Sequence, residues 1–298
     1  MVEEFTLQHN VQQEWKWLAV LDFFLAGTGA GLFLVSLFLG IEMAGVIGLV
    51  ATALGAVALL ADLGRPERFW RAISRPSTSW ISRGAILVTV FLVFGALHSA
   101  PAIPLFSGLP WTTGAGFGMV TGIIAAVAGL GVMAYTGFLL ADSPAIAAWQ
   151  SALVPIQFVA FSLLTGTGAL YLLLPFLSPS AVSLPVWEAI GLTLSVLVLL
   201  MLVAYPLILR SSTSGAREAE RELIKGRLGV PFLGGGIIIG LLIPIAVVAY
   251  LLLAGISVAA ATAPLFLIGV LLIVGGLCFR YCLLNAGFYE PVIQGMRS

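Results

Sequence analysis

The chain has 298 residues, of which 60% are hydrophobic and only 9% are charged, and its mean hydropathy is +1.13. In soluble domains about a quarter of the residues are charged. The composition of this chain therefore excludes a soluble domain and indicates a polytopic membrane protein. The 13 basic and 13 acidic residues balance to a formal net charge of zero, and we expect no nucleic-acid partner.

Long apolar segments, bounded by proline, glycine or charged residues, divide the chain. About 20 apolar residues in a helix cross the hydrocarbon core of a bilayer, so each segment predicts a membrane-spanning helix. The expected spans are residues 17–39, 43–61, 84–103, 116–140, 153–175, 187–209, 231–255 and 262–284. We therefore predict an all-α integral membrane protein with eight spans and with both termini on one side.

Positive charge gathers on the side that carries the termini. Lys16, the loops 62–83 and 210–230, and a C-terminal end with Arg280 and Arg297 account for all 13 basic residues. By the positive-inside rule, we expect this basic face to be cytoplasmic. Arginines that are needed to dock a partner would give the same count, so the opposite orientation stays open.

A short internal repeat predicts a two-part architecture. The Gly-Thr-Gly-Ala sequence of residues 27–30 recurs at residues 166–169, and a long basic loop follows spans 2 and 6. Spans 1 and 5 run in the same direction, which predicts two four-helix bundles in parallel repeat, residues 1–145 and 146–298. Close packing of helices through small residues explains the glycine motif without any further function.

One carboxylate interrupts the first span. Asp22 lies five residues past Trp17, an aromatic residue expected at headgroup level, so its side chain should lie roughly 7 to 8 Å inside the membrane. An intramembrane acid costs about 2.5 to 3.5 kcal/mol at the bilayer centre and usually serves ion, proton or ligand binding. The alternative is a structural Asp satisfied by backbone or by a loop arginine. The position that corresponds to Asp22 in the second bundle is Phe161, so its role belongs to the first bundle alone.

Tyr135 should lie at a depth similar to that of Asp22, near the end of the fourth span on the same side. A tyrosine at this level is often only a residue of the interfacial aromatic belt, and this alternative stays open.

The loop 62–83 contains two prolines, two tryptophans and five arginines. This composition predicts an ordered segment at the membrane surface, and arginines together with aromatic residues fit a partner-docking face. Charge that only sets topology, or that binds lipid headgroups, would give the same pattern. The candidate docking residues are Arg65, Arg68, Trp70, Arg71 and Arg75. The loop 210–230 predicts a short charged surface helix that ends at Gly226.

Cysteine and histidine are too few for a redox centre. Cys278 and Cys282 lie four residues apart on one apolar helix, a spacing that fits no metal or iron-sulfur motif. The two histidines, His9 and His98, fall short of the four that a two-haem anchor requires. We therefore expect no haem or metal of the chain's own. On the uncharged side, Glu42, His98 and Glu188 lie near span ends and could begin a proton path.

Several segments together resemble the NrfD/PsrC-like family, the membrane subunits of polysulfide reductase and related molybdopterin oxidoreductases. They are the Asp-bearing first span with residues 27–31, the sequences Asp-Leu-Gly-Arg-Pro at 62–66 and Ser-Trp-Ile-Ser-Arg-Gly at 79–84, and residues 135–140 and 155–168. The resemblance covers essentially the whole chain. It implies an eight-helix, haem-free subunit of a respiratory complex in the cell membrane, which binds menaquinone or ubiquinone. Such a subunit exchanges electrons with a four-cluster iron-sulfur protein, itself joined to a molybdopterin catalytic subunit, and does not act on the terminal substrate.

The resemblance also implies where the quinone binds. The family's pocket lies among the starts of spans 1 and 3 and the end of span 4, so the candidate quinone-binding residues are Asp22, Tyr135, Trp17 and Arg83. Some members have a histidine at the position of Asp22 and an additional polar residue near Ala19. Members often serve exported catalytic subunits, in which case the docking face would point outward.

Quinone reduction moves two electrons and two protons. Tyr135 can donate a hydrogen bond to a quinone carbonyl, and Asp22 can exchange a proton with it. Two other classes of function fit the sequence: a proton-coupled secondary transporter that uses Asp22, and a purely structural membrane anchor.

Overall fold

The computed structural model describes residues 10–62, 73–177, 184–256 and 262–290. Within these ranges the regular structure is helical, apart from one isolated β-bridge. The spans are α1 (Trp17–Leu39), α2 (Glu42–Asp62), α3 (Trp80–Ser99), α4 (Gly116–Ala141), α5 (Leu153–Leu177), α6 (Leu184–Arg210), a seventh formed by π-helical turns over Val230–Leu242 and by α8 (Ile243–Leu253), and α9 (Thr262–Asn285). In the part of the chain that the structure describes, eight helices are long and apolar enough to cross a membrane. The predicted all-α membrane fold is confirmed.

The third span differs from its expected bounds of 84–103. It begins at Trp80, because the hydroxyl of Ser79 accepts a hydrogen bond from the backbone N–H of Ser82 at 3.4 Å and caps the helix. It ends at Ser99, where a short 3-10 turn over Ala100–Ala102 follows. This shift places Arg83 and Gly84 inside α3.

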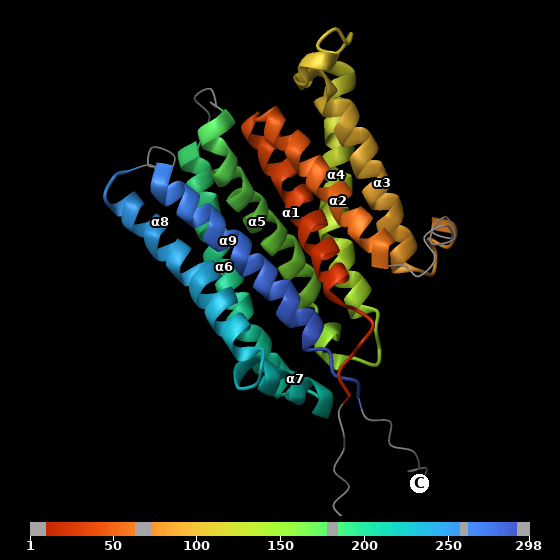
Figure 1. Cartoon of the computed structure of the whole chain (residues 1–298), viewed down its shortest axis with the longest axis vertical. Helices are drawn as coiled ribbons and strands as arrows, with labels where there is room; N and C mark the ends of the chain where they lie inside the picture. The colour runs from red at the N-terminus through yellow and green to blue at the C-terminus, as the bar shows by residue number, and fades with distance from the viewer. Residues whose placement is uncertain (1–9, 63–72, 178–183, 257–261, 291–298) are drawn as a thin grey trace, which may run out of the picture.

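Helix α1 is the most enclosed of the spans. It contacts α2, α4, α5 and α9, and Figure 1 shows it between the α2–α4 group and the α5–α9 group. In the most apolar stretch of α1, 78% of the residues are buried inside the protein, compared with 22% in the corresponding stretch of α3. A polar group on α1 therefore faces protein and not lipid.

Gly31, which directly follows the first glycine motif, meets Gly166 of the second motif where α1 crosses α5. A Cβ added at Gly31 would collide with the backbone of Ser162, and one added at Gly166 would collide with the backbone of Gly31. Next to this crossing the Thr28 hydroxyl donates a hydrogen bond to the Thr165 hydroxyl at 2.9 Å. Close helix packing thus accounts for both motifs. The division into two repeated bundles stays a prediction.

The two ends of the described chain pair with each other. Val11 and Phe288 form an antiparallel bridge, and the backbone N–H of Gln12 donates to the Gly287 carbonyl at 2.8 Å. The Gln12 side chain, which is buried, donates in addition to the Leu284 carbonyl at 3.2 Å. The segment before α1 is therefore fixed to the end of α9.

A short surface helix, α7 (Ser214–Ile224), lies at the same end of the molecule as these paired segments (Figure 1). Thr213 caps it by accepting a hydrogen bond from the Ala216 N–H at 3.4 Å. Arg221 pairs with Glu218 one turn before it, at 3.0 Å. The predicted charged surface helix in the loop 210–230 is confirmed, but it ends at Ile224 and not at Gly226.

Candidate functional site

Asp22 is enclosed by protein. Its side chain is 2% exposed, and its Oδ2 atom has no hydrogen-bond partner among the described residues. A Cβ added at Gly55 of α2 would lie 3.1 Å from the Asp22 carbonyl oxygen, which shows how closely α2 covers this position. An unpartnered carboxylate oxygen in a dry site is costly. Within the described ranges neither backbone nor an arginine satisfies this oxygen, and Arg65, Arg68 and Arg71 of the neighbouring loop lie outside those ranges. Its position fits ligand or proton binding.

Tyr135 lies close enough to Asp22 for the two groups to interact electrostatically. It is 5% exposed and comes from α4, so the structure brings together two residues that are 113 positions apart. Its ring rests on Gly84 of α3, where an added Cβ would lie 3.0 Å from the Tyr135 Cζ atom and nearer still to the ring edge. The carboxyl group of α1 and the phenol of α4 therefore lie in one region of the protein, where α3 packs against the phenol ring.

Arg83 lies next to Gly84 in sequence but binds the preceding loop. Its Nε donates to the Pro76 carbonyl at 2.8 Å and its Nη2 to the Ser77 carbonyl at 2.9 Å. Its guanidinium also covers the Trp80 ring at 4.5 Å. Arg83 thus fastens the loop to the start of α3, and a contact with quinone stays a prediction.

Trp17 packs in another direction. It is 51% exposed, and its ring meets the edge of Tyr281 on α9 at 6.1 Å. It lines a groove between the N-terminal segment and α9 together with Lys16 and Asn285. Trp17 therefore lies on the side of α1 that faces α9, whereas Tyr135 belongs to α4 and packs against α3.

Of the candidate docking residues, the structure describes only Arg75. Its side chain is exposed, and its backbone carbonyl accepts hydrogen bonds from the N–H groups of Thr78 and Ser79 at 3.3 and 3.1 Å. Arg65, Arg68, Trp70 and Arg71 lie outside the described residues. Partner docking at this loop stays a prediction.

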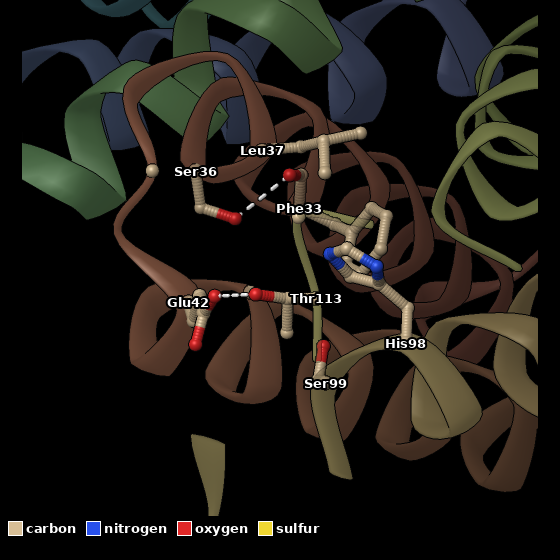
Figure 2. Close-up of a pocket in the computed structure, with 10 residues that line it drawn as sticks. Phe33, Ser36, Leu37, Glu42, His98, Ser99 and Thr113 are labelled. Carbon is tan, nitrogen blue, oxygen red and sulfur yellow. Dashed lines mark hydrogen bonds between the residues drawn. The ribbon is translucent and has the colours of Figure 1, made fainter. Parts of the chain in front are cut away.

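A second polar group of residues lies at the opposite end of the first four spans. Glu42, His98 and Thr113 line one cavity of about 150 Å³. In Figure 2, Glu42 and Thr113 lie on one side of this cavity and the imidazole of His98 on the other. Glu188 lines a different cavity, beside Tyr171 and Ser195. The structure thus joins two of the three ionisable residues noted near the uncharged span ends and separates the third.

A family model described as "Polysulphide reductase, NrfD" matches residues 6–291, nearly the whole chain. The chain belongs to the NrfD family. Members of this family are the membrane subunits of polysulfide reductase-like complexes. A search of curated proteins finds no match. In this NrfD chain, no three His, Cys, Asp or Glu side chains within the described ranges gather as a metal site.

Arg280 corrects one expectation for this NrfD protein. It was expected at the basic C-terminal end, but it lies inside α9 and is completely buried. Its Nη2 donates to the Ser162 hydroxyl at 2.9 Å and its Nη1 to the Gly276 carbonyl at 3.1 Å. The guanidinium also lies 5.7 Å from the centre of the Phe24 ring. A charge only five residues from a helix end does not mark a loop when neighbouring helices extend past it.

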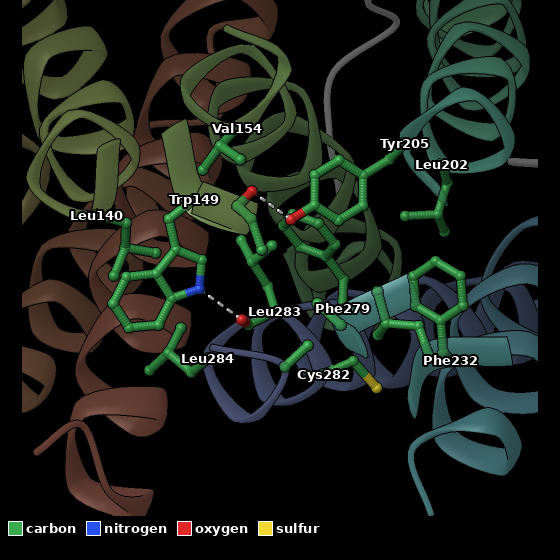
Figure 3. Close-up of a cluster of buried hydrophobic side chains, with 14 of the residues drawn as sticks. Leu140, Trp149, Val154, Leu202, Tyr205, Phe232, Phe279, Cys282, Leu283 and Leu284 are labelled. Carbon is green, nitrogen blue, oxygen red and sulfur yellow. Dashed lines mark hydrogen bonds between the residues drawn. The ribbon is translucent and has the colours of Figure 1, made fainter. Parts of the chain in front are cut away.

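A buried cluster holds the second half of the NrfD chain against α1 at the end that carries Asp22. Trp149 is fully buried at its centre, and its indole N–H donates to the Leu283 carbonyl at 2.8 Å (Figure 3). The Tyr205 hydroxyl donates to the Ala148 carbonyl at 2.7 Å. Phe23, beside Asp22, belongs to the same cluster. The cluster therefore holds α1, the helix that carries Asp22, in place.

Proposed function

We propose that this chain is the quinone-binding membrane subunit of a respiratory oxidoreductase complex, and that its site lies at Asp22 and Tyr135. One observation supports the proposal most directly. A buried carboxylate, one oxygen of which has no partner in the described part of the chain, lies within electrostatic range of a buried phenol, on a helix that the rest of the bundle encloses.

The two residues have the chemistry that quinone binding requires. The phenol of Tyr135 is a hydrogen-bond donor that holds a carbonyl oxygen in place. The carboxyl of Asp22 gains and releases a proton in a site closed to bulk water. Bound quinone, of the menaquinone or ubiquinone type, would supply the two-electron, two-proton redox chemistry that neither side chain has.

Electrons would come from a partner. We propose that an iron-sulfur subunit, joined to a molybdopterin catalytic subunit, docks on the basic face that carries the chain's termini. Arg75 and the neighbouring residues of the loop 62–83 would contact it, because exposed arginines with aromatic neighbours favour a protein interface. Asp22 and Tyr135 lie near the same face, which shortens the path of the electrons.

The test compares two carboxylates on the same side of the protein. Asp22→Asn keeps the volume of the side chain and removes its proton exchange, so quinol-dependent reduction of the clusters in the purified complex should slow by about a hundredfold or more. Asp142→Asn, at an exposed position just after α4, should leave the rate unchanged. Both variants should copurify with the partner subunits.

Three results would contradict the proposal. If Asp22→Asn has the wild-type rate, Asp22 is not the proton-exchanging group. If the wild-type complex transfers no electrons between quinol and its clusters, the subunit is a structural anchor. If reconstituted protein moves a solute in response to a proton gradient and Asp22→Asn stops it, the protein is a transporter.

We propose that the basic face with both termini is cytoplasmic, because the loops 62–83 and 210–230 are short enough for the positive-inside rule to apply. A C-terminal alkaline phosphatase fusion should then be inactive and a C-terminal green fluorescent protein fusion should be fluorescent. The reverse pattern would place the docking face outside the cell and leave the quinone site on that face.

A further inference from the structure

A polar cavity and an apolar groove meet at the end of the first four spans that lies opposite Asp22. The cavity, of about 150 Å³, is lined by Glu42, His98 and Thr113 among others. The groove, of about 680 Å³, runs between α2 and α3. Ser99 lines both spaces. The polar cavity and the apolar groove are therefore neighbours, separated by no more than the Ser99 position.

The sizes of the two spaces fit a ring that carries a long apolar chain. An engineered protein cavity of about 150 Å³ binds benzene, so the cavity accommodates one six-membered ring. The groove is lined almost entirely by apolar side chains and opens toward lipid, since Val50 and Val93 on its walls are 54% and 49% exposed. An apolar chain in the groove would lie within the hydrocarbon layer of the membrane.

The polar groups of the cavity fit a ring with hydroxyl substituents, as in a quinol. The Nδ1 of His98 lies 2.8 Å from the Gly118 carbonyl. A carbonyl only accepts hydrogen bonds, so Nδ1 carries the hydrogen and the neutral ring keeps Nε2 as an acceptor. Across the cavity the Thr113 hydroxyl donates to the Glu42 carboxylate. The Thr113 hydrogen is used in this contact, so what the site offers is acceptors, the Glu42 carboxylate and His98 Nε2, for the hydroxyl groups of a quinol.

The charge of the cavity argues against a phospholipid headgroup. The residues that line it include the carboxylate of Glu42 but no lysine or arginine. A phosphate group placed beside Glu42 would meet a like charge with no cation to balance it. An uncharged ring has no such cost.

We propose that this cavity and groove bind an isoprenoid quinone, at a second site on the membrane face opposite Asp22. The proposal rests on the proposed function for the class of ligand but concerns a different place. Ser36, which lines the cavity, lies about 21 Å along α1 from Asp22, at 1.5 Å per residue. One quinone ring cannot contact both sites.

The test is photolabelling of the intact purified complex with an azido-quinone, followed by mapping of the labelled peptides. Two sets of peptides should be labelled: those of α1 and α4 around Asp22 and Tyr135, and those of the parts of α2 and α3 that line the second site, residues 42–50 and 93–99, with residues 100–114. Val93→Trp fills the groove from its lipid-facing wall, so it should reduce the second set about tenfold and leave the first unchanged. Glu42→Gln should weaken the second set without adding bulk to the helix packing.

Val57→Trp is the matched control, because Val57 is exposed to a similar extent as Val93, at 58%, and lies on α2, the other helix of the groove wall, but does not line the groove. It should leave both sets of labelled peptides at wild-type levels.

The outcomes separate this proposal from the proposed function. Labelling of α1 and α4 alone would overturn the second site and support the first. Labelling of α2 and α3 alone would support the second site and contradict the role of Asp22. Loss of a copurified phospholipid from Val93→Trp, with no quinone label in wild-type α2 and α3, would also overturn the proposal.

Discussion

Gly84 offers a way to displace Tyr135 without altering its chemistry. In Gly84→Ala the new methyl group would collide with the Cε2 and Cδ2 atoms at the edge of the Tyr135 ring. Ordinary contact between carbon atoms begins near 3.5 Å, so the ring must move by at least about 1 Å. A hydrogen bond from the hydroxyl at about 2.8 Å would then lengthen to about 3.8 Å and be lost.

The expected cost is that of one hydrogen bond. Such a bond contributes about 0.5 to 1.5 kcal/mol, which corresponds to an increase of about 2- to 12-fold in the quinone dissociation constant. Tyr135→Phe removes the same bond and should weaken binding by the same amount. The double variant should bind no more weakly than either single variant, because both changes remove one interaction. Quinone titration of the purified complex measures all three constants.

Gly131→Ala is the control for a general effect of packing between α3 and α4. Its added methyl would meet the Leu87 Cδ2 atom at 2.6 Å, the far end of a flexible side chain that can turn aside. Quinone affinity should therefore stay at the wild-type value. If Gly84→Ala binds quinone normally, or if its effect adds fully to that of Tyr135→Phe, the phenol does not hold the quinone.

Two further predictions concern stability. Thr28→Val removes the hydroxyl that joins α1 to α5 and should lower stability by about 0.6 kcal/mol. The control Thr89→Val removes a hydroxyl that bonds only within its own helix, to the Ala85 carbonyl, and should leave stability unchanged. Thermal unfolding in detergent compares the two variants. Trp149→Phe leaves the Leu283 carbonyl without its donor and opens a cavity, so it should lower stability by about 2 to 4 kcal/mol. An unchanged melting temperature for Trp149→Phe would contradict the importance of the cluster around it.

The spans could be predicted from the sequence because length and hydrophobicity alone decide whether a helix crosses a membrane. Their ends were less certain where a local signal competes with hydropathy. The third span begins at Trp80 because Ser79 caps it, although polar residues and Arg83 made this stretch look like a loop. A capping serine followed by an apolar run was the signal that could have corrected the start.

The candidate site could be predicted in part. Asp22 and Tyr135 were expected at similar depths, and the structure brings them into electrostatic range. Trp17 was also expected near the quinone because it starts the same helix, but the direction of its side chain depends on contacts with α9. Depth along a helix follows from counting residues, whereas the face that a residue occupies follows from tertiary packing.

The far cavity illustrates what the sequence could not supply. Glu42, His98 and Thr113 come from the start of α2, the end of α3 and the loop before α4. No periodicity or spacing links them, because the contact between Glu42 and Thr113 joins residues 71 positions apart. Near a span end each of them alone is unremarkable, and only the fold shows that they line one cavity.

Arg280 changes which charges bear on sidedness. Because it is buried in α9 and bonded to Ser162, it belongs to the helix packing and no longer counts toward the loops that the positive-inside rule compares. Arg83, though near the surface, binds the carbonyls of Pro76 and Ser77 and so has a structural reason to be basic. The five basic residues of the loop 210–230, two of them on α7, then carry most of the argument, because they lie outside the quinone site. Replacing these residues, and not those of the loop 62–83, is therefore the change that should alter the orientation without disturbing Asp22 and Tyr135.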